Sequence, residues 1–175
     1  GILMSQMGHA NLVNCLFTDI GFDPSDFKDQ AVVVTGAGRG IGLQTARAFA
    51  LLGPRVVLAE LSEEGLTAEA TIREEGGQAH FIQTNVSDPR SVQALAEQTH
   101  KLFGPVSVLV NNAIFIEEAG VEEMSLDAWD RTLAVNLRGT FLTCRAFLPK
   151  MREKDQGLIL NMVSTDAMPG LSAYI

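Results

Sequence analysis

The sequence predicts an α/β fold, a doubly wound parallel sheet covered by helices on both faces in three α/β/α layers. Two observations predict it. From Phe27 onward, short apolar runs alternate with stretches of helical spacing, which is typical of repeated βα units. A glycine-rich segment, residues 35–42, also stands between the first apolar run and the first helical stretch, where a tight strand-to-helix turn needs glycine.

Five segments are expected to be strands, because each is a short run bounded by turn-forming residues. Four of them are rich in Val, Ile or Leu, as strands covered on both faces should be. In chain order the expected strands are 31–35, 55–60, 78–84, 106–111 and 157–163.

Helices are expected between these strands, and capping residues mark their ends. Asp88 before Pro89 predicts a helix start, and Gly104 predicts its end. The stretch 61–76 begins with Ser62 as the expected cap, followed by acidic residues that suit the positive end of a helix.

A long helical region is expected from Ser125, its capping residue, toward Lys154, with a bend near 136–139. Trp129 lies three residues after one leucine and four before another. This spacing places the three side chains on one helix face and favours a position for Trp129 in the core.

The chain has 175 residues, which suits one domain over 27–175 preceded by an appendage, 1–26. Its 13 Lys and Arg against 21 Asp and Glu give a net charge of −8, so a nucleic-acid partner is not expected.

The absence of a long apolar run and of a basic leader predicts a cytoplasmic protein without a membrane segment. The two cysteines are too few for a disulfide framework, and no histidine spacing indicates a metal site.

The glycine-rich segment follows the pattern TGxxxGxG, formed by Thr35, Gly36, Gly40 and Gly42. The GxGxxG pattern fails because Ile41 stands at its last glycine, and no Lys-Ser or Lys-Thr pair follows as in a kinase-type phosphate loop. Glycines in such a turn let backbone N–H groups and a helix N-terminus approach a pyrophosphate. We therefore expect a Rossmann-type fold that binds NAD, with NADP as the alternative.

These residues resemble the short-chain dehydrogenase/reductase family, and four later segments extend the resemblance over 27–175. The run 111–113, Asn-Asn-Ala, is similar to an element after the family's fourth strand, and Asn136 matches an asparagine of the following helix. Segment 157–164 resembles the strand that delivers a catalytic serine, and 172–174 resembles the start of a YxxxK motif. The resemblance implies an enzyme that interconverts a secondary alcohol and a ketone by hydride transfer.

Ten residues are expected to bind the cofactor. Glu60 ends the second expected strand, where a carboxylate accepts hydrogen bonds from ribose hydroxyls and repels a 2′-phosphate, which favours NAD; a solvated strand end is the alternative. Arg39 favours NADP, because a basic side chain in the glycine turn could pair with that phosphate. Asn85 is either an adenine contact or a turn residue. The ten are Gly36, Arg39, Gly40, Ile41, Gly42, Glu60, Asn85, Val86, Asn112 and Ala113.

For catalysis the resemblance implies Tyr174 as the general acid/base, Ser164 as the group that polarises the substrate oxygen, and Asn136 as support for a proton-relaying water. Positive charge has to lower the tyrosine pKa from about 10. In the family a lysine four residues later supplies it, at a position beyond Ile175. The interval from Ser164 to Tyr174 is 10 residues, about three fewer than usual in the family, and Ile114 replaces an expected glycine.

We therefore expect the domain to continue beyond Ile175, with its C-terminal part missing from this sequence. The alternative is a nonenzymatic dinucleotide-binding or interaction module that lacks the lysine. The expected partners are a small alcohol or ketone and further copies of the chain, as a homodimer or homotetramer. Family members pair through the helix that carries Asn136. Its apolar residues suit either a core or an interface: Leu133, Leu137, Phe141 and Leu148.

Overall fold

Within residues 27–164, which the computed structural model describes, the chain forms a parallel sheet of five strands in the order β3-β2-β1-β4-β5. The predicted appendage, 1–26, lies outside the described residues. The strand bounds are β1 Ala31–Thr35, β2 Arg55–Glu60, β3 Gln78–Gln83, β4 Val108–Asn111 and β5 Leu158–Asn161. The predicted parallel sheet is therefore confirmed.

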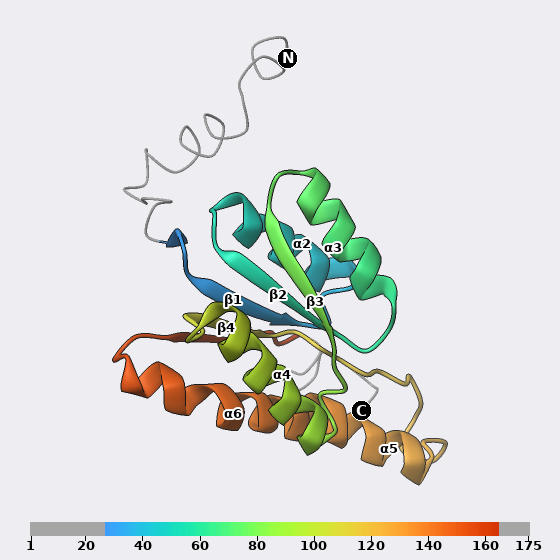
Figure 1. Cartoon of the computed structure of the whole chain (residues 1–175). Helices are drawn as coiled ribbons and strands as arrows, with labels where there is room; N and C mark the ends of the chain where they lie inside the picture. Colours follow the sequence, from blue (N-terminus) through green and yellow to red (C-terminus); the bar gives the residue numbers. More distant parts are fainter. Residues whose placement is uncertain (1–26, 165–175) are drawn as a thin grey trace.

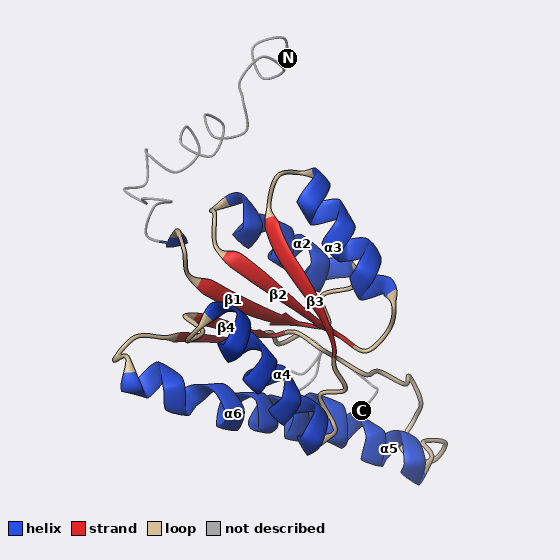
Figure 2. Cartoon of the chain, in the orientation of Figure 1, coloured by secondary structure: helices blue, strands red, loops and turns tan. Residues whose placement is uncertain are grey.

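Helices cover both faces of the sheet, which gives the predicted three layers (Figures 1 and 2). α2 and α3 lie on one face, and α4 and α6 lie on the other. α5 continues through a π-helical segment, η3, into α6. The bounds are α2 Gly40–Leu51, α3 Glu64–Glu74, α4 Pro89–Phe103, α5 Leu126–Thr132, η3 Leu133–Gly139 and α6 Thr140–Glu153. No helix in this part of the chain is both long and apolar enough to cross a membrane.

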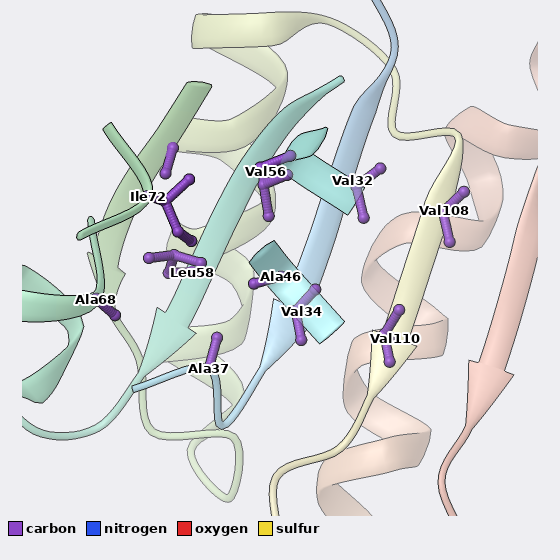
Figure 3. Close-up of a cluster of buried hydrophobic side chains, with 12 residues drawn as sticks. Val32, Val34, Ala37, Ala46, Val56, Leu58, Ala68, Ile72, Val108 and Val110 are labelled. Carbon is purple, nitrogen blue, oxygen red and sulfur yellow. The ribbon is translucent and has the colours of Figure 1, made fainter. Parts of the chain in front are cut away.

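Alternate side chains of the central strands build two cores, one on each face of the sheet. On the α2 and α3 side, valines of β1, β2 and β4 pack with Ala46 of α2 and Ile72 of α3 (Figure 3). On the other side, Val33 of β1 and Leu109 of β4 pack with Phe147 of α6. Full burial of each such aliphatic or aromatic side chain contributes about 1.5–3 kcal/mol. The strands therefore form a rigid base for the loops at their carboxyl ends.

Most expected element ends are confirmed. Asp88 caps α4 by accepting from the Arg90 N–H at 2.9 Å, and Ser125 caps α5 by accepting from the Ala128 N–H at 3.1 Å. A π-helical segment, η3, spans the residues near 136–139 where a bend is expected. β3, β4 and β5 are one to three residues shorter than expected. β5 is shortened at both ends because, within the described chain, it pairs with β4 alone.

Two expectations for individual side chains are wrong. Glu63 rather than Ser62 precedes α3, because the Ser62 hydroxyl turns toward neighbouring carboxylates instead of the helix N–H groups. Trp129 is 39% exposed and does not belong to the core, and the two leucines spaced with it are exposed as well. The buried residue of α5 is Ala128, so the larger apolar side chains of this short helix face outward.

His100 lies on α4 against α6. Its ring meets Phe147 edge-on, with ring centroids 5.6 Å apart, and its Nε2 is buried without a hydrogen-bond partner among the described residues. Burial lowers the pKa of His100 and the charge of Lys150 lowers it further, while Glu153 opposes the shift. The packing between α4 and α6 therefore favours the neutral imidazole.

We expect protonation of His100 to weaken this packing. Because its pKa is lowered in the fold, the unfolded chain takes up the proton first, so the free energy of unfolding falls as the pH drops below the unfolded value of about 6.5. His100→Leu keeps an apolar contact with Phe147 and removes the titration, so it should reduce this fall. Urea unfolding of both proteins at about pH 7.5 and about pH 5.5 measures the difference. An equal fall in both proteins would show that His100 is not responsible.

Candidate functional site

A cleft of about 760 Å³ opens at the carboxyl ends of the strands. The strand order reverses between β1 and β4, and open α/β sheets bind ligands at such a point. All ten residues that the sequence singles out for a cofactor line this cleft. They come from the turn after β1, the end of β2, the loop after β3 and the loop after β4. The fold thus brings four distant segments together.

The turn after β1 depends on glycine at three positions. Gly36 has a φ of 64° and Gly40 has a φ of 54°, which other residues rarely adopt. A Cβ at Gly42 would lie 2.1 Å from the Gly36 carbonyl oxygen and 2.5 Å from Nδ2 of Asn112. The N-cap of α2, Arg39, makes no side-chain capping bond, and the first turn contains no acidic residue. The positive N-terminal end of α2 is therefore available at the cleft and suits a phosphate.

Thr35 and Asn112 tie this turn to the loop after β4. The Thr35 hydroxyl accepts from the N–H groups of Asn112 and Ala113, both at 3.0 Å. It donates to the Val110 carbonyl oxygen at 3.3 Å. Nδ2 of Asn112 donates to the carbonyl oxygens of Thr35 and Gly36, at 3.0 and 3.1 Å. Two walls of the cleft are thus fixed relative to each other before any ligand binds, which lowers the cost of ordering them.

The carboxylate of Glu60 is fixed at the end of β2 by the backbone around it. Its Oε2 accepts from the Gly38 N–H at 3.1 Å. Its Oε1 accepts from the N–H groups of Leu61 and Ser62, at 2.8 and 3.1 Å, and from the Ser62 hydroxyl at 3.3 Å. Each carboxylate oxygen has about two acceptor positions, so Oε2 keeps one for a further donor. This geometry favours an oriented acceptor over a freely solvated strand end.

Asn85 and Val86 lie in the loop after β3. Oδ1 of Asn85 accepts from the Ser87 N–H at 3.0 Å and from the Ser87 hydroxyl at 2.7 Å. Both acceptor positions of this oxygen are engaged in a turn, which favours the turn role of Asn85 over an adenine contact through Oδ1. Val86 is buried beneath η3, where a Cβ at Gly139 would lie 3.0 Å from its side chain.

Asn136 in η3 holds the loop after β4 with both ends of its side-chain amide. Its Oδ1 accepts from the Phe115 N–H at 2.8 Å, and its Nδ2 donates to the Phe115 carbonyl oxygen at 2.9 Å. The guanidinium of Arg131 lies over the Phe115 ring, 4.2 Å from its centroid. Phe115 and Arg131 line the cleft, whereas Asn136 stands behind them. The side chain of Asn136 therefore acts on the cleft through the loop that it holds.

A polar network joins β4, β5 and α6 beside the cleft, with Asn111 and Thr143 buried and Asn161 exposed. Nδ2 of Asn111 donates to Oδ1 of Asn161 at 2.9 Å, and Oδ1 of Asn111 accepts from the Thr143 hydroxyl at 2.6 Å. Asn161 ends β5, and the exposed Ser164 follows three residues later at the same edge of the sheet. The network fixes the strand end that leads to the expected catalytic serine. Tyr174 lies outside the described residues.

Sequence reasoning missed several residues that line or brace the cleft. Thr35 could have been found, because it belongs to the TGxxxGxG pattern and its hydroxyl is the bracing group. Most of the others adjoin a residue or motif that the sequence did single out, whereas Arg131 belongs to a segment with no local motif and meets the cleft only through tertiary packing. The missed residues are Thr35, Ala59, Leu61, Ser62, Glu63, Glu64, Thr84, Ile114, Phe115, Arg131 and Val135.

Comparisons with known proteins agree with this geometry. Residues 30–175 match the family described as short chain dehydrogenase. A D-threitol dehydrogenase of Mycolicibacterium smegmatis is 42% identical over 149 residues, which are 83% of this chain and 56% of the relative. The crystal structure of a metagenomic short-chain oxidoreductase in complex with NADP has a TM-score of 0.78 and 36% identity, over 83% of this chain and 67% of that chain.

An NAD+-bound xylitol dehydrogenase structure has a TM-score of 0.79 and 31% identity, over 82% of this chain and 56% of that chain. The chain spans about half the length of the curated relatives that it matches, with 54% and 56% coverage for two of them. The residues that match the family model, 30–175, include the sheet, the glycine turn and the residues that line the cleft.

Proposed function

Because the chain belongs to the short-chain dehydrogenase family, we propose that it carries the cofactor site of an NAD-preferring oxidoreductase that interconverts a secondary alcohol and a ketone. The observation that carries the proposal is the cleft, where five residues of the glycine turn at the N-terminus of α2 face five more residues from three other segments. The alcohol substrate class is supported by relatives named D-threitol dehydrogenase and xylitol dehydrogenase.

The residues of the cleft fit a nicotinamide dinucleotide in their chemistry. The turn from Gly36 to Gly42 and the N-terminus of α2 bind the pyrophosphate, because backbone N–H groups at a helix start without a side-chain cap can approach it closely. Glu60 accepts hydrogen bonds from the adenosine ribose hydroxyls through the acceptor position left on Oε2. Ala113 and the neighbouring loop form the opposite wall.

When bound, the nicotinamide ring supplies the hydride acceptor or donor for the reaction. Ser164 holds and polarises the substrate oxygen, and Tyr174 moves the proton to or from it. The side chain of Asn136 is engaged with Phe115, so support for a proton-relaying water falls to its main-chain carbonyl. That oxygen accepts from the Thr140 hydroxyl at 3.1 Å.

Self-association is supported by an apolar face that runs along α5, η3 and α6. Leu137 is 68% exposed and Phe141 is 58% exposed, so these side chains lie outside the core that residues 27–164 form. Contiguous apolar surface of this kind marks contact with another protein, and we expect a homodimer or homotetramer. The exposed apolar residues of this face are Leu126, Trp129, Leu133, Leu137, Phe141 and Leu148.

Titration of the full chain with NAD+ and NADP+ by calorimetry, followed by assays with a panel of secondary alcohols, tests the proposal. We expect tighter binding of NAD+, and we expect Glu60→Ser to weaken NAD+ by about tenfold through the lost charge-assisted hydrogen bonds while it relieves the repulsion of NADP+. Dinucleotide binding without turnover across the panel would favour the nonenzymatic module. Failure of the chain to bind either dinucleotide would overturn the proposal.

A further inference from the structure

The wall of the cleft beside β2 carries more negative than positive charge. Arg39 stands in the glycine turn, Glu60 ends β2, and Glu63 and Glu64 lead into α3. One arginine thus faces three carboxylates along this wall. A local excess of one charge sign discriminates between ligands that differ in charge.

Glu64 lies beside two positive groups of this wall, the guanidinium of Arg39 and the N-terminus of α3. Its Oε2 lies 3.7 Å from Nε of Arg39. It is also the first residue of α3, an 11-residue helix, where a carboxylate is favoured by the positive end of the helix. The Ser62 hydroxyl lies 3.4 Å from the same Oε2 and 3.3 Å from Oε1 of Glu60. This hydroxyl has one proton and can donate to only one of the two carboxylates at a time.

Close packing on the glycine turn keeps the two carboxylates in place. A Cβ at Gly38 would lie 2.8 Å from Cγ of Glu60 and 3.0 Å from Cβ of Glu64, so both side chains rest on the backbone of the turn. The side chain of Arg39, by contrast, is 83% exposed, and the carboxylate of Glu64 is the acidic group that lies beside it. This neighbouring negative charge lowers the positive potential that Arg39 offers to a ligand in the cleft.

We propose that Glu64 is a cofactor-specificity residue that acts together with Glu60 to exclude NADP. The inference rests on the proposed function, because it concerns the same cofactor site. Arg39 and the N-terminus of α3 are the groups beside Glu60 that would attract a 2′-phosphate, and Glu64 neutralises both. Glu60 favours the ribose hydroxyls of NAD by accepting their hydrogen bonds. Glu64 disfavours the 2′-phosphate of NADP by neutralising the positive charge of Arg39 and of the α3 N-terminus.

If Glu64 contributes to cofactor choice, a substitution at Glu64 should change the preference for NAD+ over NADP+ while Glu60 is still present. Glu64→Gln removes the carboxylate and keeps the shape of the side chain, so it releases Arg39 and the positive helix end. The ratio of NADP+ affinity to NAD+ affinity should rise about tenfold, as expected for the loss of one close like charge in a partly solvated site. The gain should shrink at high salt, because these charges are exposed and screened.

Calorimetric titrations of the full chain with NAD+ and NADP+ test the inference. Glu63→Gln is the matched control, because it removes the same charge from the same wall without touching the ion pair of Arg39. It should change the affinity ratio by no more than about twofold. Combining Glu64→Gln with Arg39→Gln should remove most of the gain, since the released arginine is then absent.

The outcomes separate this inference from the function on which it rests. A higher affinity ratio in Glu64→Gln, lost again in the double variant, supports it. Normal NAD+ binding with equal ratios in the wild type, Glu64→Gln and Glu63→Gln overturns the role of Glu64 and leaves the proposed function standing. Equal rises in Glu64→Gln and Glu63→Gln also overturn it, because general charge would then explain the effect. Absence of binding of either dinucleotide by the wild type overturns both.

Discussion

Replacing Gly42 with valine is expected to abolish measurable dinucleotide binding. Any Cβ at this position would lie 2.1 Å from the carbonyl oxygen of Gly36 and 2.5 Å from Nδ2 of Asn112. Both atoms belong to the hydrogen-bonded seam that closes the glycine turn against the loop after β4. The turn therefore has to open, and it loses the backbone approach on which phosphate binding depends. We expect NAD+ affinity to fall by at least about 100-fold and stability to fall by about 2–4 kcal/mol.

Ala48→Val is the control for Gly42→Val, because Ala48 lies on the exposed side of the same helix. It introduces the same β-branched side chain into α2 and should leave NAD+ affinity within about twofold of the wild type. Calorimetry with NAD+ and urea unfolding give the two quantities. Retention of wild-type NAD+ affinity in a folded Gly42→Val protein would remove the turn from the phosphate site.

The glycine turn could be predicted from the sequence, because its backbone geometry depends on a few adjacent residues. The turn needs glycine where φ is positive at Gly36 and Gly40 and where Gly42 meets the backbone. The spacing TGxxxGxG therefore located the cleft before any tertiary information. The carboxylate of Glu60 followed from the same logic, since parallel strands end at one edge of the sheet.

Contacts between distant segments could not be predicted in the same way. Arg131 reaches the cleft by stacking on Phe115, which requires that α5 crosses the loop after β4. Nothing in the residues near either side chain indicates this crossing. Asn85 shows that a local contact can also be missed. Its amide oxygen suits an adenine contact by chemistry, but it accepts hydrogen bonds from Ser87 two residues away.

Trp129 shows what helical spacing can and cannot establish. The spacing identified an apolar face, and that face exists along α5, η3 and α6. It could not say what covers the face, because a core and a protein interface select the same residue types. Trp129 was wrongly assigned to the core for this reason, whereas the choice between core and interface stayed open for the leucines and Phe141 further along the face.

Asn136→Ala is expected to release the loop after β4 from η3. The substitution removes both hydrogen bonds to Phe115, at 2.8 and 2.9 Å, and with them the link between the helix and the wall of the cleft. At about 1 kcal/mol for each hydrogen bond, the free energy of unfolding should fall by about 2 kcal/mol. NAD+ affinity should fall by about tenfold, because binding then has to order the loop that the wild type holds in place.

Hydrogen exchange of the Phe115 amide measures this effect directly, since that N–H donates to the side chain that is removed. Thr140→Val is the matched control. It removes the hydroxyl that donates to the Asn136 carbonyl and leaves both bonds to Phe115 intact. We expect much faster exchange at Phe115 in Asn136→Ala and near-native exchange in Thr140→Val. Unchanged protection of that amide in Asn136→Ala would mean that the loop is held by its apolar contacts, and Asn136 would then act through its main-chain carbonyl alone.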